Sequence, residues 1–240
     1  MMKKHYILFV FLGFSFFSNA QIDLLKKASE KAFKLINTEN PLSSEEISDG
    51  LIEALIKGSE YSVNSASAKG GFNYNSLIRI PFPEEAKKMK TALIKIGFKG
   101  NVESFEKSIN SAAELASEKA LLILMDAIKQ MSIKDALSIL NGEDNAATIY
   151  LQNHTYKFLY SEFKPIVIFS MKEVQIAKQW NKLITKYNSI PLTKKINPDL
   201  EDYITNKTIE GLFILIAIEE KNIRENPKAR ITELLKKVFK

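Results

Sequence analysis

The chain has 240 residues, a formal net charge of +6 and no cysteine. The absence of cysteine excludes disulfides, thiolate metal sites and cysteine nucleophiles. The surplus of basic residues is small and spread over the whole length, so composition does not favour a nucleic-acid partner.

The first twenty residues have the layout of a cleaved secretory signal. Lys3 and Lys4 precede an apolar run over residues 6–17, and small residues precede Gln21. This run is about half of the ~20 residues that a membrane-spanning helix needs. We therefore expect residues 1–20 to be a signal peptide. Residues 21–240 are expected to form a single exported domain, located in the periplasm or outside the cell.

The chain after the signal shows helical periodicity from its start. An apolar stripe over residues 22–37 predicts a first helix. Ser43 and Glu46 form a capping box, which predicts that a second helix begins there. Inside this helix, Gly50 and Gly58 each cost about 1 kcal/mol relative to alanine. Their presence indicates that a neighbouring helix approaches closely at these positions.

A long connection follows, over residues 67–83, where the helical period disappears. Its second half, residues 77–83, is apolar and contains two prolines, so we expect an extended segment that packs against the body of the protein. Pro83 is suited to the head of the next helix, predicted over residues 84–96. A long helix is then expected over residues 102–131.

Over residues 120–125 this long helix is apolar on every side, which is typical of a central helix that its neighbours cover all round. Ser132 and Asp135 predict the start of a short helix that ends at residues 141–142. Asp144 is expected to cap the helix after it. Pro165 should end or kink that helix.

Further helices are predicted over residues 166–187, 199–222 and 227–239, and residues 212–218 form a second apolar segment. Strands are nowhere favoured. The expected fold is therefore an all-α bundle of about eight to nine helices, with the two apolar segments buried at its centre. The last helix is both basic and apolar. We expect it to dock on the bundle, and the alternative is weak contact with an anionic membrane surface.

Six blocks of the sequence stand out: residues 42–47 with 50–51, 78–83, 126–131, 140–142 with 146–148, 186–188, and 202–230. In order and spacing, these blocks closely resemble a bacterial family of exported proteins known as domain of unknown function 4197. The resemblance extends from about Leu42 to Phe239 and implies an exported, mostly helical protein. It implies no activity, substrate or catalytic residue.

Only three of the thirty-four basic residues are arginines, and all three lie within these blocks: Arg79, Arg224 and Arg230. In a chain so rich in lysine, these positions favour a requirement for a planar, bidentate donor. We treat the three arginines as candidate binding residues; the alternative is chance codon usage. Glu219 and Glu220 are expected to form ion pairs with Arg224 or Lys221.

His154 is the one histidine outside the predicted signal. No carboxylate lies three or four residues from it, so a helical histidine–carboxylate metal pair is excluded there. A structural role is the expected one. The sequence also lacks a Gly-x-Ser-x-Gly turn, and Gly70-Gly71 lacks the context of a phosphate loop. No metal and no cofactor are expected.

These observations favour a non-enzymatic exported protein that binds another envelope protein or an apolar small molecule lodged between helices. In the second case, Arg79 or Arg230 would hold an acid head group of a lipid-like molecule. The alternative is a hydrolase-type enzyme whose site is assembled from dispersed residues. The candidates for that site are His154, Tyr187, Asp126 and Glu219.

Overall fold

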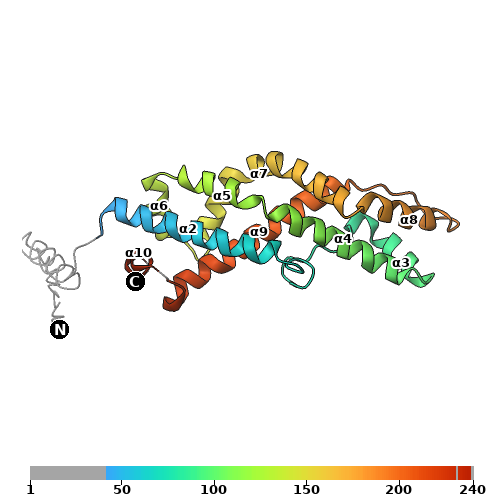
Figure 1. Ribbon diagram of the computed structural model, residues 1–240, viewed down its shortest axis with the longest axis horizontal. Coiled ribbons are helices and arrows are strands. Elements are labelled where there is room, and N and C mark those ends of the chain that lie inside the picture. The colour runs from blue at the N-terminus through green and yellow to red at the C-terminus, as the bar shows by residue number, and fades with distance from the viewer. Residues whose placement is uncertain (1–41, 231, 239–240) are drawn as a thin grey trace, which may run out of the picture. The chain divides into compact units, whose positions relative to one another are not determined.

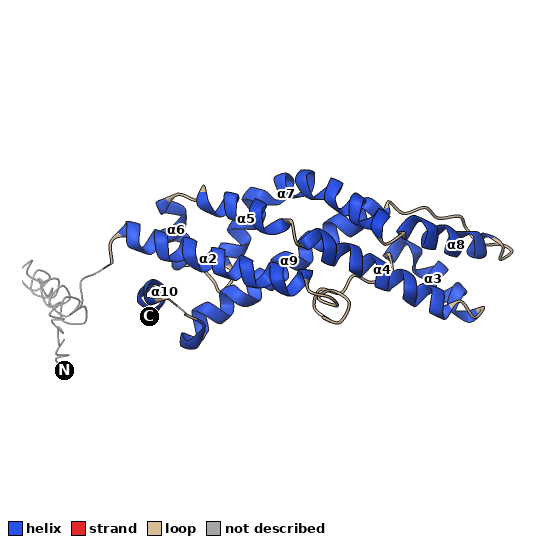
Figure 2. Ribbon diagram, viewed as in Figure 1, coloured by secondary structure: helices blue, strands red, loops and turns tan. Residues whose placement is uncertain are grey.

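A computed structural model describes residues 42–230 and 232–238. The predicted signal peptide and the predicted helix over residues 22–37 lie outside these ranges. Within them the chain forms nine α-helices, two short 3-10 helices and no strand. The described part of the chain is coloured only as helix and loop in Figure 2. The predicted all-α class and number of helices are therefore confirmed for the described part of the chain.

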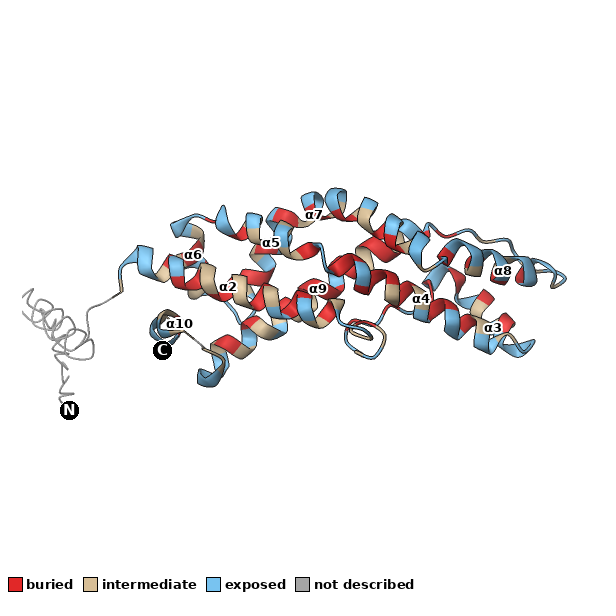
Figure 3. Ribbon diagram, viewed as in Figure 1, coloured by how far each residue is buried: buried red, intermediate tan, exposed pale blue. Residues whose placement is uncertain are grey.

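The helices pack in an order that brings the C-terminal half against the N-terminal half. The central helix α9 packs against α7, α2 and α4, while α3 and α8 lie together at one end of the body and α6 and α10 at the other (Figure 1). Buried positions face the neighbouring helices and exposed positions face outward (Figure 3). The α-helices are α2 (Ser44–Ser67), α3 (Lys87–Lys95), α4 (Lys99–Ser117), α5 (Ala120–Lys129), α6 (Ile133–Leu140), α7 (Ala146–Glu173), α8 (Ile176–Asn188), α9 (Leu200–Glu225) and α10 (Glu233–Val238); the 3-10 helices are η1 (Glu84–Ala86) and η2 (Pro227–Ala229).

The helix starts predicted at Ser43 and Ser132 are confirmed. The Ser43 hydroxyl accepts a hydrogen bond from Glu46 N at 3.1 Å, and Ser43 N donates to the Glu46 carboxylate at 2.8 Å. Ser132 and Asp135 form the same reciprocal pair at the start of α6. Asp199 caps α9 by accepting from the backbone N–H of Asp202. Each cap satisfies N–H groups that have no partner inside the helix.

The single helix predicted over residues 102–131 is wrong: the chain bends after Ser117, and α4 and α5 are separate helices. The expectation that residues 120–125 are covered all round is also wrong. Ala120 and Leu124 are buried, but Leu122 is 71% exposed. Because α2, α4 and α7 cover only one side of α5, its other side faces solvent. The second apolar segment, residues 212–218 of α9, is buried as expected only in part: Leu212, Phe213 and Ile216 are buried, whereas Ile218 is 46% exposed.

Pro165 does not end its helix, since α7 continues through it to Glu173. A proline removes one N–H, so the carbonyl four residues earlier, that of Ser161, loses its helical partner. Both residues are exposed, so water can satisfy this carbonyl. The helix ends instead before Gln175, which adopts a left-handed conformation with φ of 54°.

The last helix docks on the bundle, as expected, over the described residues 233–238. Leu235 is fully buried in it. A β-carbon built on Gly50 of α2 would lie 2.6 Å from the Val238 side chain, so only glycine permits this approach. At Gly58 the nearest atom, from Glu219, is 3.6 Å away, which is an ordinary contact. The predicted close approach is thus confirmed at Gly50, whereas Gly58 leaves space for a methyl group.

Candidate functional site

Residues 68–83, called the strap below, connect α2 to η1 and lie across α4 without helical structure. The predicted packing against the body is confirmed, because Phe72, Ile80 and Phe82 are buried. Phe82 contacts the ring of Phe105 in α4 and the ring of Trp180 in α8. The first part of the strap is a series of turns and not an extended segment.

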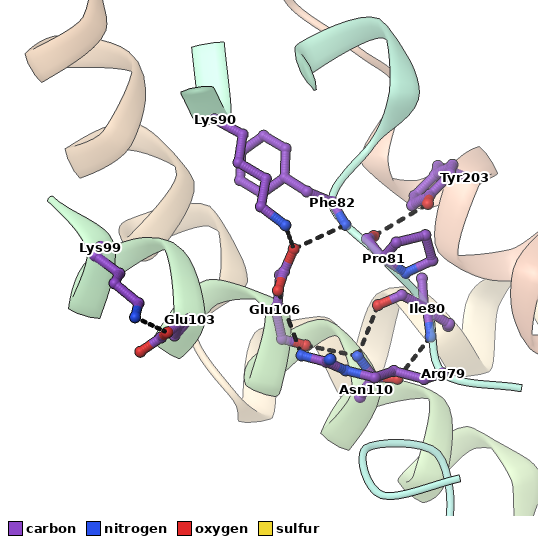
Figure 4. Close-up of polar contacts among 10 residues, drawn as sticks. All are labelled: Arg79, Ile80, Pro81, Phe82, Lys90, Lys99, Glu103, Glu106, Asn110 and Tyr203. Atoms are coloured by element: carbon purple, nitrogen blue, oxygen red, sulfur yellow. Dashed lines mark hydrogen bonds and ion pairs between the residues drawn. The ribbon is translucent and has the colours of Figure 1, made fainter. Parts of the chain in front are cut away.

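Three polar residues of α4 hold the strap: Glu106, Asn110 and Glu114. They are spaced by four, so they share one face of the helix. The Asn110 side chain accepts from Ile80 N and donates to Ile80 O, both at 2.8 Å (Figure 4). Glu114 accepts from Phe72 N at 3.3 Å. Side chains of α4 thus satisfy backbone groups that the strap cannot pair within itself.

Glu106 is the most heavily bonded member of this set. Its carboxylate accepts from Phe82 N at 3.1 Å and from the side chains of Arg79 and Lys90 (Figure 4). The Arg79 side chain is 47% exposed, whereas that of Glu106 is 8% exposed. Arg79 therefore neutralises a buried carboxylate. Nearby, the Tyr203 hydroxyl donates to Pro81 O at 3.0 Å.

A second buried polar cluster joins α6, α7 and α9. Glu220 accepts from the backbone N–H groups of Ala147 and Thr148, both at 2.9 Å, at the start of α7. The predicted cap from Asp144 is therefore wrong, because a carboxylate from α9 occupies that position. Asp144 instead pairs with Lys221 on the surface. The prediction that one of the two adjacent glutamates pairs with Arg224 is confirmed, with an Nη2–Oε1 distance of 2.9 Å.

Arg224 and Arg230 bind carbonyl oxygens at the C-terminal ends of helices. Arg224 donates to Ile139 O at 2.9 Å and to Leu140 O at 3.3 Å, at the end of α6. Arg230 donates to Ile223 O at 3.0 Å and to Arg224 O at 2.7 Å, at the end of α9. The last carbonyls of a helix lack internal partners, and a planar guanidinium reaches two of them at once.

Two small cavities lie between helices, one between α2, α7 and α9 and one between α5, α7 and α9. Each measures about 10 Å³, which is room for about one water molecule. Neither Arg79 nor Arg230 lines them. These two cavities are therefore too small for a lipid-like molecule, and the larger hollows at the surface are the candidate binding sites.

An open hollow of about 830 Å³ lies between α3, the end of α8 and the segment that follows α8. It is called the basic hollow below. Lysines outnumber glutamates four to two in its lining. Tyr187, one of the candidate residues, lies in its wall. The lining comprises the charged residues Lys87, Lys88, Lys95, Lys194, Glu84 and Glu85, the polar Thr91, and the floor residues Met89, Ala92, Tyr187 and Ile196.

A second open hollow of about 460 Å³ lies between α5 and α7 and brings two further candidates together, Asp126 and His154. It is called the α5–α7 hollow below. Tyr187 does not line it. Glu219 lies elsewhere, beside Gly58 of α2, where its carboxylate accepts from Asn222. The four residues considered for a hydrolase-type site are therefore divided among three places.

No helix in residues 42–230 and 232–238 is long and apolar enough to cross a membrane. The same residues contain no group of three or more histidine, aspartate or glutamate side chains placed to hold a metal ion.

The family whose description is "Protein of unknown function (DUF4197)" matches residues 41–240 of this chain. Comparison with curated proteins and with solved structures gives no match. The matched range contains every described helix, the strap and both open hollows. On this match the chain belongs to the DUF4197 family.

Proposed function

We propose that this chain is a non-enzymatic, exported helical protein that binds an acidic, lipid-like molecule in the basic hollow. The proposed export rests on the signal-like pattern of residues 1–20, with its positive start, short apolar run and small residues before Gln21. The proposed binding rests on one feature, the combination of an apolar floor with a rim of lysines.

The floor and rim suit the two parts of such a ligand. Met89 and Tyr187 are buried, and Ala92 and Ile196 are partly buried, so the bottom of the hollow is firm and mostly apolar. Burial of hydrocarbon on such a surface contributes about 25 cal/mol per Å². The four lysines are exposed, and Lys87 lies 3.3 Å from the Glu84 carboxylate of the same rim. Their long side chains can reach a carboxylate or phosphate at the mouth. A volume near 830 Å³ is in the range of small-molecule sites.

Tyr187 adds a specific polar group. Its side chain is nearly buried, with 6% exposure, yet its hydroxyl makes no hydrogen bond to any residue that the structure describes. The hydroxyl oxygen itself is not fully buried, so it is open to a partner from the hollow. An acid head group held by the lysines would supply one.

We do not advance a hydrolase-type enzyme, because the residues considered for it do not converge. A general base and the group that it assists must lie within hydrogen-bond reach of a common substrate. His154 and Asp126 share the α5–α7 hollow, while Tyr187 lies in the basic hollow and Glu219 lies beside α2.

Calorimetric titration with decanoate tests the proposal, with decanol and decylamine as neutral and cationic comparators. We expect saturable binding of decanoate and at least tenfold weaker binding of the other two. The double variant Lys87→Gln/Lys194→Gln and the variant Tyr187→Phe should each weaken decanoate binding about tenfold, since a hydrogen bond to a charged group contributes about 1.5–3 kcal/mol. The control Lys172→Gln/Lys178→Gln removes exposed lysines outside the hollow and should change nothing.

Equal binding of decanol and decanoate would contradict the role of the lysine rim. Equal binding by the wild type and by both hollow variants would show that decanoate binds elsewhere. If no decanoate binds but an acidic peptide of an envelope protein does, the partner is a protein and not a lipid-like molecule.

A further inference from the structure

We infer that the α5–α7 hollow is a separate binding site for an organic cation, either a free amine or guanidine or the lysine or arginine side chain of a partner protein. This inference does not depend on the proposed function of the basic hollow. It rests on the donors, acceptors and aromatic faces that line this second hollow: Asp126, Gln130, Tyr150, His154, Thr155 and Phe158.

The hydrogen bonds of His154 determine what it offers to a ligand. Its Nδ1 lies 2.8 Å from the carbonyl oxygen of Tyr150, one turn earlier in α7. A carbonyl can only accept, so Nδ1 carries the proton in the neutral ring. Nε2 then presents a lone pair. The imidazole is also held in place by stacking on the Tyr150 ring, with centroids 4.0 Å apart.

The two hydroxyl groups in the wall have already used their protons. Tyr150 donates to the Asp135 carboxylate at 3.1 Å, and Thr155 donates to Leu151 O at 2.5 Å. Burial, followed by the bond to Asp135, raises the pKa of Tyr150, so this phenol keeps its proton at neutral pH. Towards a ligand, these two hydroxyl oxygens can therefore act as hydrogen-bond acceptors.

Asp126 provides the charge. No described residue donates a hydrogen bond to its carboxylate or forms an ion pair with it, and no described lysine or arginine lines the hollow. Asp135 stands behind Tyr150 and adds a second negative charge close by. Apart from the Gln130 amide, which can present either its oxygen or its nitrogen, the polar wall therefore consists of acceptors.

The aromatic groups complete the match. Phe158 is 54% exposed, although an aromatic side chain of this size is usually buried. Its ring borders the same hollow as the Asp126 carboxylate. A cation above an aromatic face gains about 0.5–1 kcal/mol at an exposed site. A guanidinium or ammonium group has N–H donors for the acceptors, a positive charge for Asp126 and a surface that packs on Phe158.

The test is an NMR titration of the ¹⁵N-labelled protein with N-acetylarginine amide, using N-acetylcitrulline amide as the neutral isostere. We expect saturable shifts at the backbone amides of Asp126, Gln130 and Thr155 with the arginine compound and none with citrulline. Methylguanidine and the peptide acetyl-Leu-Arg-Leu-amide distinguish the two sources. Equal affinity indicates a free cation, and tighter binding of the peptide indicates a protein side chain.

Matched variants locate the site. Asp126→Asn should weaken binding at least tenfold, whereas Asp49→Asn, which removes an exposed carboxylate from α2, should not. Phe158→Ala should weaken it about threefold. Its control, Phe169→Ala, removes another exposed ring of the same helix, one that lies outside the hollow. The inference is overturned if citrulline causes the same shifts as arginine, or if the two aspartate variants bind equally well.

Discussion

The strap on α4 and the junction of α6 with α7 satisfy their buried backbone groups in different ways. Both contain buried backbone groups that no regular helix satisfies. On the strap, the Asn110 side chain pairs with both backbone groups of Ile80. The carboxylates of Glu106 and Glu114 each accept from backbone N–H groups of the strap. At the junction, Glu220 and Arg224, one turn apart on α9, satisfy the start of α7 and the end of α6.

The difference between the two regions is in how the charges are compensated. Glu106 is paired with Arg79 and Lys90, whose side chains are 47% and 33% exposed. Either cationic side chain can leave the ion pair and be solvated by water at little cost in free energy. Glu220 and Arg224 are 7% and 11% exposed, so loss of either side chain breaks an ion pair that is shielded from water. The junction should therefore be the more sensitive of the two regions to a single substitution.

The largest expected effect is at the junction. Glu220→Ala should lower the free energy of unfolding by about 3–5 kcal/mol, because a buried ion pair with Arg224 is broken and two N–H groups of α7 lose their acceptor. Urea denaturation followed by circular dichroism measures it. The matched control is Glu219→Ala, which removes a neighbouring carboxylate that contacts Asn222 and should cost less than about 1 kcal/mol. Equal losses for the two variants would contradict the comparison.

On the strap, Asn110→Ala should cost about 2–3 kcal/mol, because both backbone groups of Ile80 lose their partner in a buried place. Hydrogen exchange should show loss of protection at the Ile80 amide, with α9 amides unchanged. Asn153→Ala, at an exposed position of α7, serves as the control. A strap that stays protected in the Asn110 variant would show that its apolar side chains alone hold it.

A pair of glycine variants sharpens the comparison further, since the strap also packs against α9. A β-carbon at Gly211 would lie 2.8 Å from the Phe72 ring and 3.2 Å from Ile78, so Gly211→Ala should cost about 1–3 kcal/mol. At Gly58 the nearest atom is at 3.6 Å, and Gly58→Ala should stabilise α2 by about 0.5–1 kcal/mol. Thermal denaturation measures both. The same sign for both variants would contradict this account of the packing.

The smallest expected effect concerns pH. Burial, and then the negative charges of Glu84, Glu106 and Glu210, raise the pKa of Tyr203 from 10.0 to about 12. The unfolded chain ionises first, so this contribution to stability is complete below pH 10 and is lost as pH rises toward 12. In Tyr203→Phe, the fall in unfolding free energy between pH 9 and pH 11 should be smaller, by at most about 1 kcal/mol.

The control for that measurement is Tyr61→Phe, because Tyr61 is 63% exposed. Its pH dependence should match that of the wild type. A Tyr203 variant that also matches the wild type would show that the strap is released before this tyrosine ionises.

The candidate residues illustrate what a sequence reveals about sites. The pairing of Glu220 with Arg224 was predictable, since residues four apart on a helix are neighbours. The four-residue spacing of Glu106, Asn110 and Glu114 was an equally local signal, and it was missed because acids on a helix usually face water. That Asp126 and His154 share a hollow had no local signal, because it depends on how α5 and α7 pack.

By itself, the sequence determined the helical class and the positions where helices begin, because periodicity and capping act over three or four residues. Ser43, Ser132 and Asp199 show this directly. Only the tertiary structure decided that α5 exposes Leu122, that Glu220 rather than Asp144 caps α7, and that Arg224 and Arg230 bind carbonyl oxygens. Burial and long-range caps depend on which helix arrives as a neighbour, and that is decided when the whole body packs.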